Sequence, residues 1–355
     1  MTLGCLMVDV PGRRLLPEDR DVLEHPLVGG VILFTRNYES PAQLAELVRE
    51  IHAVRTPRLL VGVDHEGGRV QRFRPEFTLV PPMRRIGREY DMDAARGREL
   101  ARTAGWLIAS ELRAVGIDLA FAPVTDLDIG VSEVIGDRSF HRDPAVVAAL
   151  AGALMAGMRD AGMSATAKHF PGHGAVVADS HVALPVDRRE YADLEPDLTP
   201  YRRLIANGLP SVMMAHVVFP AVDSLPASLS RRWVTDVLRG ELGFQGAVFT
   251  DDLSMAGAVA FGGVTERASL ALAAGCDMLL VCNSRPAVEE LLAALDPAPR
   301  PASALRIARL HGRGPAPEAG GHAMLRASAA WQRAHAALER CREARPELRL
   351  DGDVT

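Results

Sequence analysis

The sequence predicts a single-domain α/β protein, a (β/α)8 TIM barrel, and two observations carry that prediction. Eight short apolar runs recur between residues 3 and 282. They are continuous instead of alternating, which is typical of strands buried on both faces. Amphipathic stretches of helical length separate most of them, and such repeated alternation fits a barrel of parallel strands surrounded by helices. A doubly wound sheet is the alternative, because periodicity does not reveal strand order.

Each expected strand ends in polar residues or is followed by them, and glycines end two of the expected helices. Gly116 and Gly162 stand just past amphipathic stretches, where glycine commonly terminates a helix. The expected strands are residues 3–10, 29–34, 59–64, 119–126, 165–170, 211–216, 246–251 and 277–282. The expected helices are residues 41–55, 95–116, 143–162, 192–206, 230–242 and 265–274.

The composition changes near residue 296. Residues 1–296 are expected to form the catalytic barrel and 297–355 a C-terminal helical extension and tail. Proline- and glycine-rich connectors lie at 296–303 and 311–323, and a helical pattern follows at 322–343. A helix packed on the outside of the barrel, followed by a frayed terminus, accounts for this segment.

Composition and charge exclude several classes of protein. The chain has 355 residues, of which 24% are charged, with a net charge of −5. No strongly basic face is evident, so we expect no nucleic-acid partner. The N-terminus lacks the basic leader of a signal peptide, and no apolar run reaches the roughly 18 residues of a transmembrane helix. We expect a monomer in the cytoplasm, without a membrane partner. The four cysteines lack the paired spacing of a disulfide framework or zinc ribbon.

Polar side chains stand where the expected strands end. Asp64 ends the third run, Lys168 and His169 the fifth, His216 the sixth, and Asp251 with Asp252 the seventh. In a barrel these ends meet at one mouth, where catalytic residues lie. Successive strand residues point to opposite faces, so Asp251 is the better candidate to face the mouth and Asp252 to support the next helix. Any one of these aspartates can instead be a helix cap.

Two loops add polar groups suited to a hydroxylated ligand. Arg72 lies in "VDHEGGRVQRF" (63–73) and Arg138 in "IGDRSFHRDP" (135–144). The guanidinium fork suits recognition of hydroxyl or carboxylate groups. The segment "KHFPGHGAVVADSH" (168–181) is rich in histidine, and its spacing alone fits either a metal site or a loop for proton transfer.

Five motifs in order resemble glycoside hydrolase family 3 β-N-acetylhexosaminidases of the bacterial NagZ type, over about residues 3–285. They are "GGVILFTRN", "VDHEGGRVQR", "IGDRSF", "KHFPGHG" with "DSH" after it, and "FTDDLSM". The resemblance implies a barrel that removes terminal N-acetylglucosamine (GlcNAc) from β-glycosides with retention. Its substrates would be muropeptides in which GlcNAc is linked to 1,6-anhydro-N-acetylmuramic acid, in peptidoglycan recycling.

The resemblance also implies roles for individual residues, with neither metal nor cofactor. Asp251 matches the nucleophile, His181 the general acid/base and Asp179 its partner. The positions that match the sugar-binding residues are Asp64, Arg72, Arg138, Lys168 and His169. The chemistry is consistent, because imidazole donates and accepts protons near pH 6.5 and a nearby carboxylate fixes its tautomer.

Two other functions remain open at this point. A metal-dependent hydrolase would use His169, His173, Asp179 and His181 as ligands. A non-catalytic sugar-binding barrel would use Asp251 to hold a hydroxyl. In the glycosidase interpretation His173 is a structural residue in the turn "PGHG".

Overall fold

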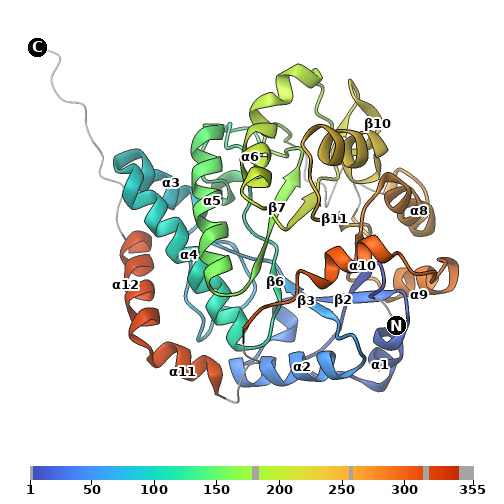
Figure 1. The fold of residues 1–355 in the computed structure, drawn as a ribbon, viewed down its shortest axis with the longest axis horizontal. Helices are drawn as coiled ribbons and strands as arrows, with labels where there is room; N and C mark the ends of the chain where they lie inside the picture. The colour runs from blue at the N-terminus through green and yellow to red at the C-terminus, as the bar shows by residue number, and fades with distance from the viewer. Residues whose placement is uncertain (1–2, 178–183, 256–258, 315–319, 344–355) are drawn as a thin grey trace, which may run out of the picture.

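A closed barrel of eight parallel strands forms the centre of the computed structural model, which describes residues 3–177, 184–255, 259–314 and 320–343 (Figure 1). Neighbouring strands follow chain order, and the last pairs with the first, Leu6 opposite Leu279. This closure confirms the predicted barrel and excludes the doubly wound sheet. The strands are β1 (Leu6–Asp9), β2 (Val28–Leu33), β3 (Leu60–Val63), β6 (Leu119–Ala120), β7 (Ser164–Phe170), β8 (Ser211–Met214), β11 (Ala247–Asp252) and β12 (Met278–Val281).

Large apolar side chains fill the inside of the barrel. Phe121 and Phe249 meet edge to face, with ring centroids 5.4 Å apart. Gly62 makes room for them, since a Cβ there would lie 3.3 Å from the Phe121 ring. Ile307, from the segment after the barrel, belongs to the same buried cluster. The interior is therefore a packed core, and any ligand must bind above it, at one end of the strands.

Helices surround the barrel and begin at recognisable caps. The Ser40 side chain accepts from Gln43 N at the start of α2, and Asp143 accepts from Ala145 N at the start of α5. The helices are α1 (Pro17–Glu24), α2 (Pro41–Ala53), α3 (Met83–Met92), α4 (Ala94–Ala114), α5 (Pro144–Asp160), α6 (Glu195–Ala206), the π-helix η5 (Arg232–Glu241), α8 (Val264–Ala274) and α9 (Arg285–Ala294). The six predicted helices are all present, whereas α1, α3 and α9 were not predicted.

Two short hairpins stand beside the barrel. β4 (His65–Gly67) pairs with β5 (Val70–Gln71) directly after β3. β9 (Val218–Phe219) pairs with β10 (Asp223–Pro226) after β8. Both follow the carboxyl end of a barrel strand and so extend the wall of that end.

The C-terminal segment forms three helices against the barrel: α10 (Pro301–Ala308), α11 (Gly321–Ala327) and α12 (Ala329–Glu343). One helix was predicted here, at 322–343, and the structure differs in two respects: α10 begins inside the predicted connector 296–303, and the extended backbone of Ser328 (ψ 143°) divides the predicted helix in two. α11 and α12 lie beside α4 in Figure 1, where Trp331 Nε1 donates to Glu111 Oε1 at 2.8 Å.

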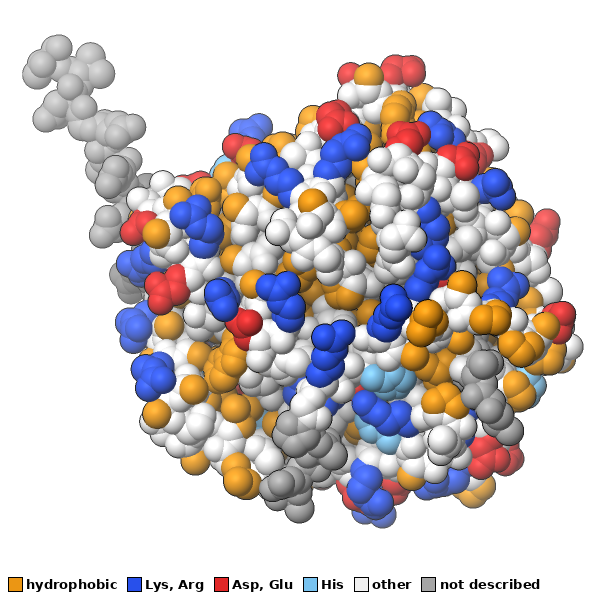
Figure 2. Space-filling view, viewed as in Figure 1, with side chains coloured by type: hydrophobic (Ala, Val, Ile, Leu, Met, Phe, Trp, Pro, Cys, Tyr) orange, Lys and Arg blue, Asp and Glu red, His pale blue; other side chains and the backbone are white. Residues whose placement is uncertain are grey.

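Figure 2 shows basic side chains between apolar atoms across the face seen in Figure 1. Within the described residues, no helix is long and apolar enough to cross a membrane.

Candidate active site

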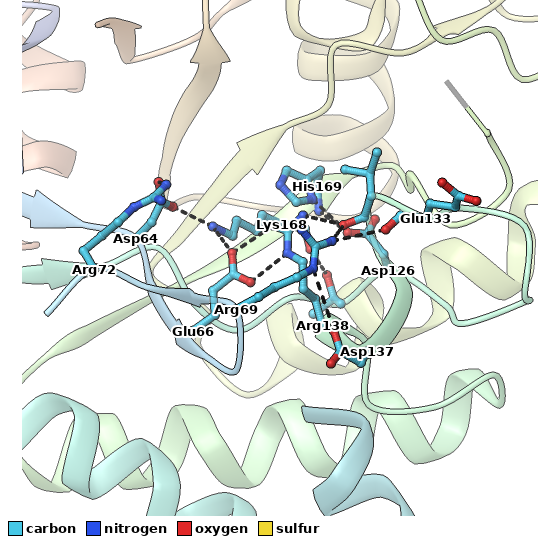
Figure 3. Close-up of polar contacts among 12 residues, drawn as sticks. Asp64, Glu66, Arg69, Arg72, Asp126, Glu133, Asp137, Arg138, Lys168 and His169 are labelled. Atoms are coloured by element: carbon cyan, nitrogen blue, oxygen red, sulfur yellow. Dashed lines mark hydrogen bonds and ion pairs between the residues drawn. The ribbon is translucent and has the colours of Figure 1, made fainter. Parts of the chain in front are cut away.

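Charged side chains of opposite sign meet at the carboxyl end of β3 and β7 (Figure 3). Lys168, on β7, is only 2% exposed. Its Nζ lies 2.8 Å from Oδ1 of Asp64, just after β3, and 2.6 Å from Oε1 of Glu66 on β4. Arg72, just after β5, donates to Asp64 Oδ2 at 3.3 Å. The structure therefore brings together three of the predicted sugar-binding residues.

Arg138 joins the same cluster through Glu66. Arg138 Nε and Nη2 donate to the two carboxylate oxygens of Glu66, both at 2.8 Å, a two-point geometry that fixes both planes. Arg138 Nη1 also donates to the Val134 carbonyl at 3.1 Å. Sequence reasoning assigned no role to Glu66, although this buried residue holds two predicted sugar-binding cations at once.

The cluster stays ionised because its charges compensate one another. Burial alone would raise the pKa of Glu66, but Arg138 and Lys168 outweigh it and hold that pKa well below its usual range. Burial would likewise raise the pKa of Asp64, and Lys168 with Arg72 lowers it instead. Burial would lower the pKa of Lys168, yet Asp64 and Glu66 raise it. The result is a wall of fixed donors and acceptors, suited to a ligand with several hydroxyl groups.

A second buried carboxylate, Asp126, supports His169. Asp126 Oδ2 lies 2.8 Å from His169 Nδ1 and also accepts from His169 N at 3.2 Å. Its Oδ1 accepts from His173 N at 2.7 Å. Burial alone would raise the pKa of Asp126, but His169 outweighs it and lowers that pKa. Sequence reasoning did not single out Asp126, although it ends the predicted strand run 119–126 and the strand-end criterion applies to it.

Asp251 and Asp252, at the end of β11, line the same cavity as the charged cluster. The cavity has a volume of about 690 Å³. Asp252 N donates to Asp251 Oδ1 at 2.9 Å. Asp252 also accepts from Ser254 N at 3.0 Å and from Cys282 N at 3.1 Å, so it supports the turn after β11, whereas the sequence predicted that it supports the next helix. The predicted residues that line the cavity are Asp64, Arg72, Arg138, Lys168, His169 and Asp251.

His216, the polar end of the sixth predicted strand, supports Asp252 instead of lining the cavity. Its Nδ1 lies 2.6 Å from Ser228 Oγ and its Nε2 lies 2.9 Å from the Asp252 carbonyl oxygen. Burial lowers its pKa, which keeps the ring neutral. One nitrogen of the neutral ring can then donate to the carbonyl while the other accepts from the serine.

Asp179 and His181, the predicted acid/base pair, lie outside the described residues. Of the four ligands considered for a metal site, only His169 and His173 are described, and His169 Nδ1 is taken by Asp126. No group of three or more His, Cys, Asp or Glu side chains in the described parts of the chain is arranged to hold a metal ion.

Fold and site together define a barrel enzyme with a polar cavity at the carboxyl end of its strands. Residues 5–310 match the family described as the glycosyl hydrolase family 3 N terminal domain. A beta-hexosaminidase of Thioalkalivibrio sulfidiphilus is 59% identical over 313 residues, covering 88% of this chain and 90% of that protein. One of Nitrosospira multiformis is 56% identical over 314 residues, covering 88% and 90%.

Solved structures give the same result. NagZ from Neisseria gonorrhoeae in complex with N-trifluoroacetyl-D-glucosamine matches with a TM-score of 0.90 at 42% identity, covering 96% of this chain and 99% of that one. The same neisserial protein in complex with zinc ion matches with a TM-score of 0.89 at 41% identity, covering 96% and 98%. The chain belongs to glycoside hydrolase family 3, among its β-hexosaminidases.

Proposed function

We propose that this enzyme removes terminal, non-reducing GlcNAc from β-glycosides with retention of configuration. The observation that carries the proposal is the position of Asp251. It stands at the end of β11 and lines the cavity that Asp64, Lys168 and Arg138 also line. The sugar complex of the neisserial relative and the names of the curated relatives support GlcNAc as the sugar.

In the proposed mechanism the Asp251 carboxylate attacks the anomeric carbon as the bond to the leaving oxygen breaks. His181 gives its proton to that oxygen, so a covalent glycosyl-enzyme forms and the aglycone alcohol departs. Water then attacks the same carbon, His181 takes its proton, and Asp251 is released as the carboxylate. Asp179 would hold the imidazole in the required tautomer and stabilise its protonated form. The "DSH" motif (179–181) supports the roles of His181 and Asp179.

We further propose that the substrates are peptidoglycan fragments with GlcNAc linked to 1,6-anhydro-N-acetylmuramic acid. The reaction would belong to cell-wall recycling in the cytoplasm, and the enzyme would act as a monomer without a cofactor. The resemblance to the NagZ type supports this narrower assignment. The test compares the rate of hydrolysis of purified GlcNAc-1,6-anhydro-N-acetylmuramic acid with that of chitobiose. Equal rates on the two disaccharides would contradict this narrower assignment.

Trapping the covalent intermediate tests the nucleophile. A fluorinated GlcNAc donor that slows deglycosylation should label one peptide, spanning residues 247–255, and mass spectrometry should place the sugar on Asp251. The matched control is Asp252→Asn, which should still be labelled, while Asp251→Ala should not. Labelling of another peptide, with full activity in Asp251→Ala, contradicts the assignment.

Chelation separates the glycosidase from the metal-dependent alternative. Activity on 4-nitrophenyl β-N-acetylglucosaminide should survive exhaustive treatment with EDTA. This control is needed because the neisserial relative has a zinc complex. Loss of activity that zinc restores would favour the metal-dependent hydrolase. No turnover by the untreated enzyme would favour the sugar-binding barrel.

A further inference from the structure

His173 stands out among the buried histidines because nothing satisfies its ring. The side chain lines the cavity, and the residue is 3% exposed. Neither Nδ1 nor Nε2 has a hydrogen-bond partner, and both atoms are buried. Among the described residues, His173 is the one histidine whose two ring nitrogens are both buried without a hydrogen-bond partner. An unpaired buried polar group destabilises the fold, so such a group calls for an explanation.

The backbone around His173 is held without help from the ring. His173 N donates to Asp126 Oδ1 at 2.7 Å. The flanking glycines let this turn approach its neighbours closely, since a Cβ on Gly174 would lie 2.1 Å from the Leu127 carbonyl oxygen. A Cβ on Gly172 would lie 2.7 Å from Asp197 Oδ1. The turn therefore needs glycine and Asp126, whereas the imidazole adds no hydrogen bond to it.

The surroundings of the ring are those of the candidate active site. Its centroid lies 6.1 Å from that of His169, at a steep angle. Burial, followed by the charge of His169, lowers the pKa of His173, while Asp126 and Asp251 act in the opposite direction. The neutral ring has one nitrogen that donates and one that accepts. A sugar hydroxyl, which both donates and accepts, matches either nitrogen.

We propose that His173 is a further substrate-contacting residue, whose unpaired ring nitrogen bonds to a hydroxyl of the sugar in the cavity. The inference rests on the proposed function, because it requires a sugar as the ligand. It replaces the purely structural role that the "PGHG" turn suggests. The unliganded enzyme then carries an unsatisfied group that the substrate satisfies, an arrangement typical of sites where stability is given up for binding.

Two leucine variants separate binding from structure. His173→Leu should unfold at or above the wild-type temperature, because it replaces two unpaired polar atoms with an apolar side chain of similar length. The matched control is His216→Leu, which breaks the bonds to Ser228 and to the Asp252 carbonyl and should unfold several degrees lower. A His173→Leu enzyme that unfolds as low as the control, or fails to fold, would overturn the proposal.

Deoxy substrates identify the contact. For 4-nitrophenyl β-N-acetylglucosaminide, kcat/KM of His173→Leu should fall by about 10- to 100-fold, as expected for losing a hydrogen bond to substrate. The same comparison is then made with the 3-, 4- and 6-deoxy analogues. On one of them, kcat/KM of His173→Leu should equal that of wild type, because that analogue lacks the hydroxyl that bonds to His173. His173→Gln, which keeps a donor and an acceptor, should recover part of the rate on the parent glycoside.

The same measurements separate the two proposals. An equal loss on all three analogues and the parent, or no loss on the parent, overturns the role of His173 and leaves the glycosidase intact. A wild-type enzyme that turns over none of these glycosides overturns the proposed function itself.

Discussion

The Lys168 ammonium lies 2.6 Å from the Glu66 carboxylate, and both side chains are almost completely buried. The second cation on Glu66 is Arg138, which binds both of its oxygens. One acidic side chain on a short hairpin therefore sets the direction of two cations that reach the cavity from other parts of the chain. Breaking such a buried network leaves charges without partners, which costs far more than an exposed ion pair contributes.

Glu66→Gln should impair both stability and substrate binding. The neutral amide leaves Arg138 and Lys168 with too few acceptors, so the free energy of unfolding should fall by about 3 kcal/mol or more. The two cations should also lose their fixed directions, raising KM by about tenfold or more. Urea unfolding and steady-state kinetics measure the two effects. Glu133→Gln, an exposed residue at the rim of the same cavity, is the control and should change neither.

Asp126→Asn should weaken the support of His169. The carboxylate accepts from His173 N on one oxygen and from His169 N on the other. An amide presents an NH2 group to one of these donors whichever way it is placed, at a cost of about 1 to 3 kcal/mol. We expect kcat/KM to fall by about 10- to 100-fold. Asp128→Asn, two residues away and outside the cavity lining, should keep wild-type kinetics.

The strands were predictable because each one is a continuous apolar run, and buried strands require such runs. The helices were less predictable than the strands. α3 carries only Met83 and Ile86 as large buried apolar side chains, too few to mark a helix. The break at Ser328 leaves no periodic signal, since both flanking segments are helical in pattern.

Some residues of the candidate active site were predictable from the sequence and others were not. Residues at strand ends, such as Asp64 and Lys168, were predictable because barrel topology brings those ends together. Asp126 also ends a predicted run, so its place at the mouth was predictable too. The contacts that Glu66 and Asp126 make were not predictable, because they join residues 43 or more positions apart. Such a contact is set by the tertiary packing of loops, and a single sequence carries no local pattern for it.

Asp277 should be a major source of stability for the C-terminal segment. This residue, 1% exposed, accepts from Arg239 Nη2 at 2.6 Å and Val248 N at 2.9 Å through one oxygen. Its other oxygen accepts from Ser303 Oγ at 2.7 Å and Arg306 Nη1 at 3.0 Å, which ties α10 to the barrel. Asp277→Ala should lower the free energy of unfolding by about 3 to 5 kcal/mol. Arg306→Ala, which removes only one partly exposed partner, should cost about 1 kcal/mol in the same urea titration.

Asp252 is a carboxyl group that the folded enzyme keeps protonated more readily than the unfolded chain does. Burial raises its pKa from 3.8 to about 6, against the opposing hydrogen bonds from Ser254 and Cys282. The geometry suits the protonated form. The Ser254 hydroxyl has one proton but two acceptors within reach, Asp252 Oδ2 at 2.8 Å and the Cys282 carbonyl at 3.0 Å. A proton on Asp252 can be donated to Ser254 Oγ, which then donates to the carbonyl.

Asp252→Asn should therefore change how stability depends on pH. Between about pH 4 and 6 folded Asp252 holds a proton that the unfolded chain has released, so its contribution to stability falls as pH rises and levels off above about pH 6. Asparagine mimics the protonated acid and has no such loss. Relative to wild type, the variant should gain about 1 to 3 kcal/mol of unfolding free energy between pH 4.5 and 7.5. Urea titrations at the two pH values measure this gain, with exposed Asp193→Asn as the control that should show none. A gain in Asp252→Asn no larger than that in the control would contradict the raised pKa of Asp252.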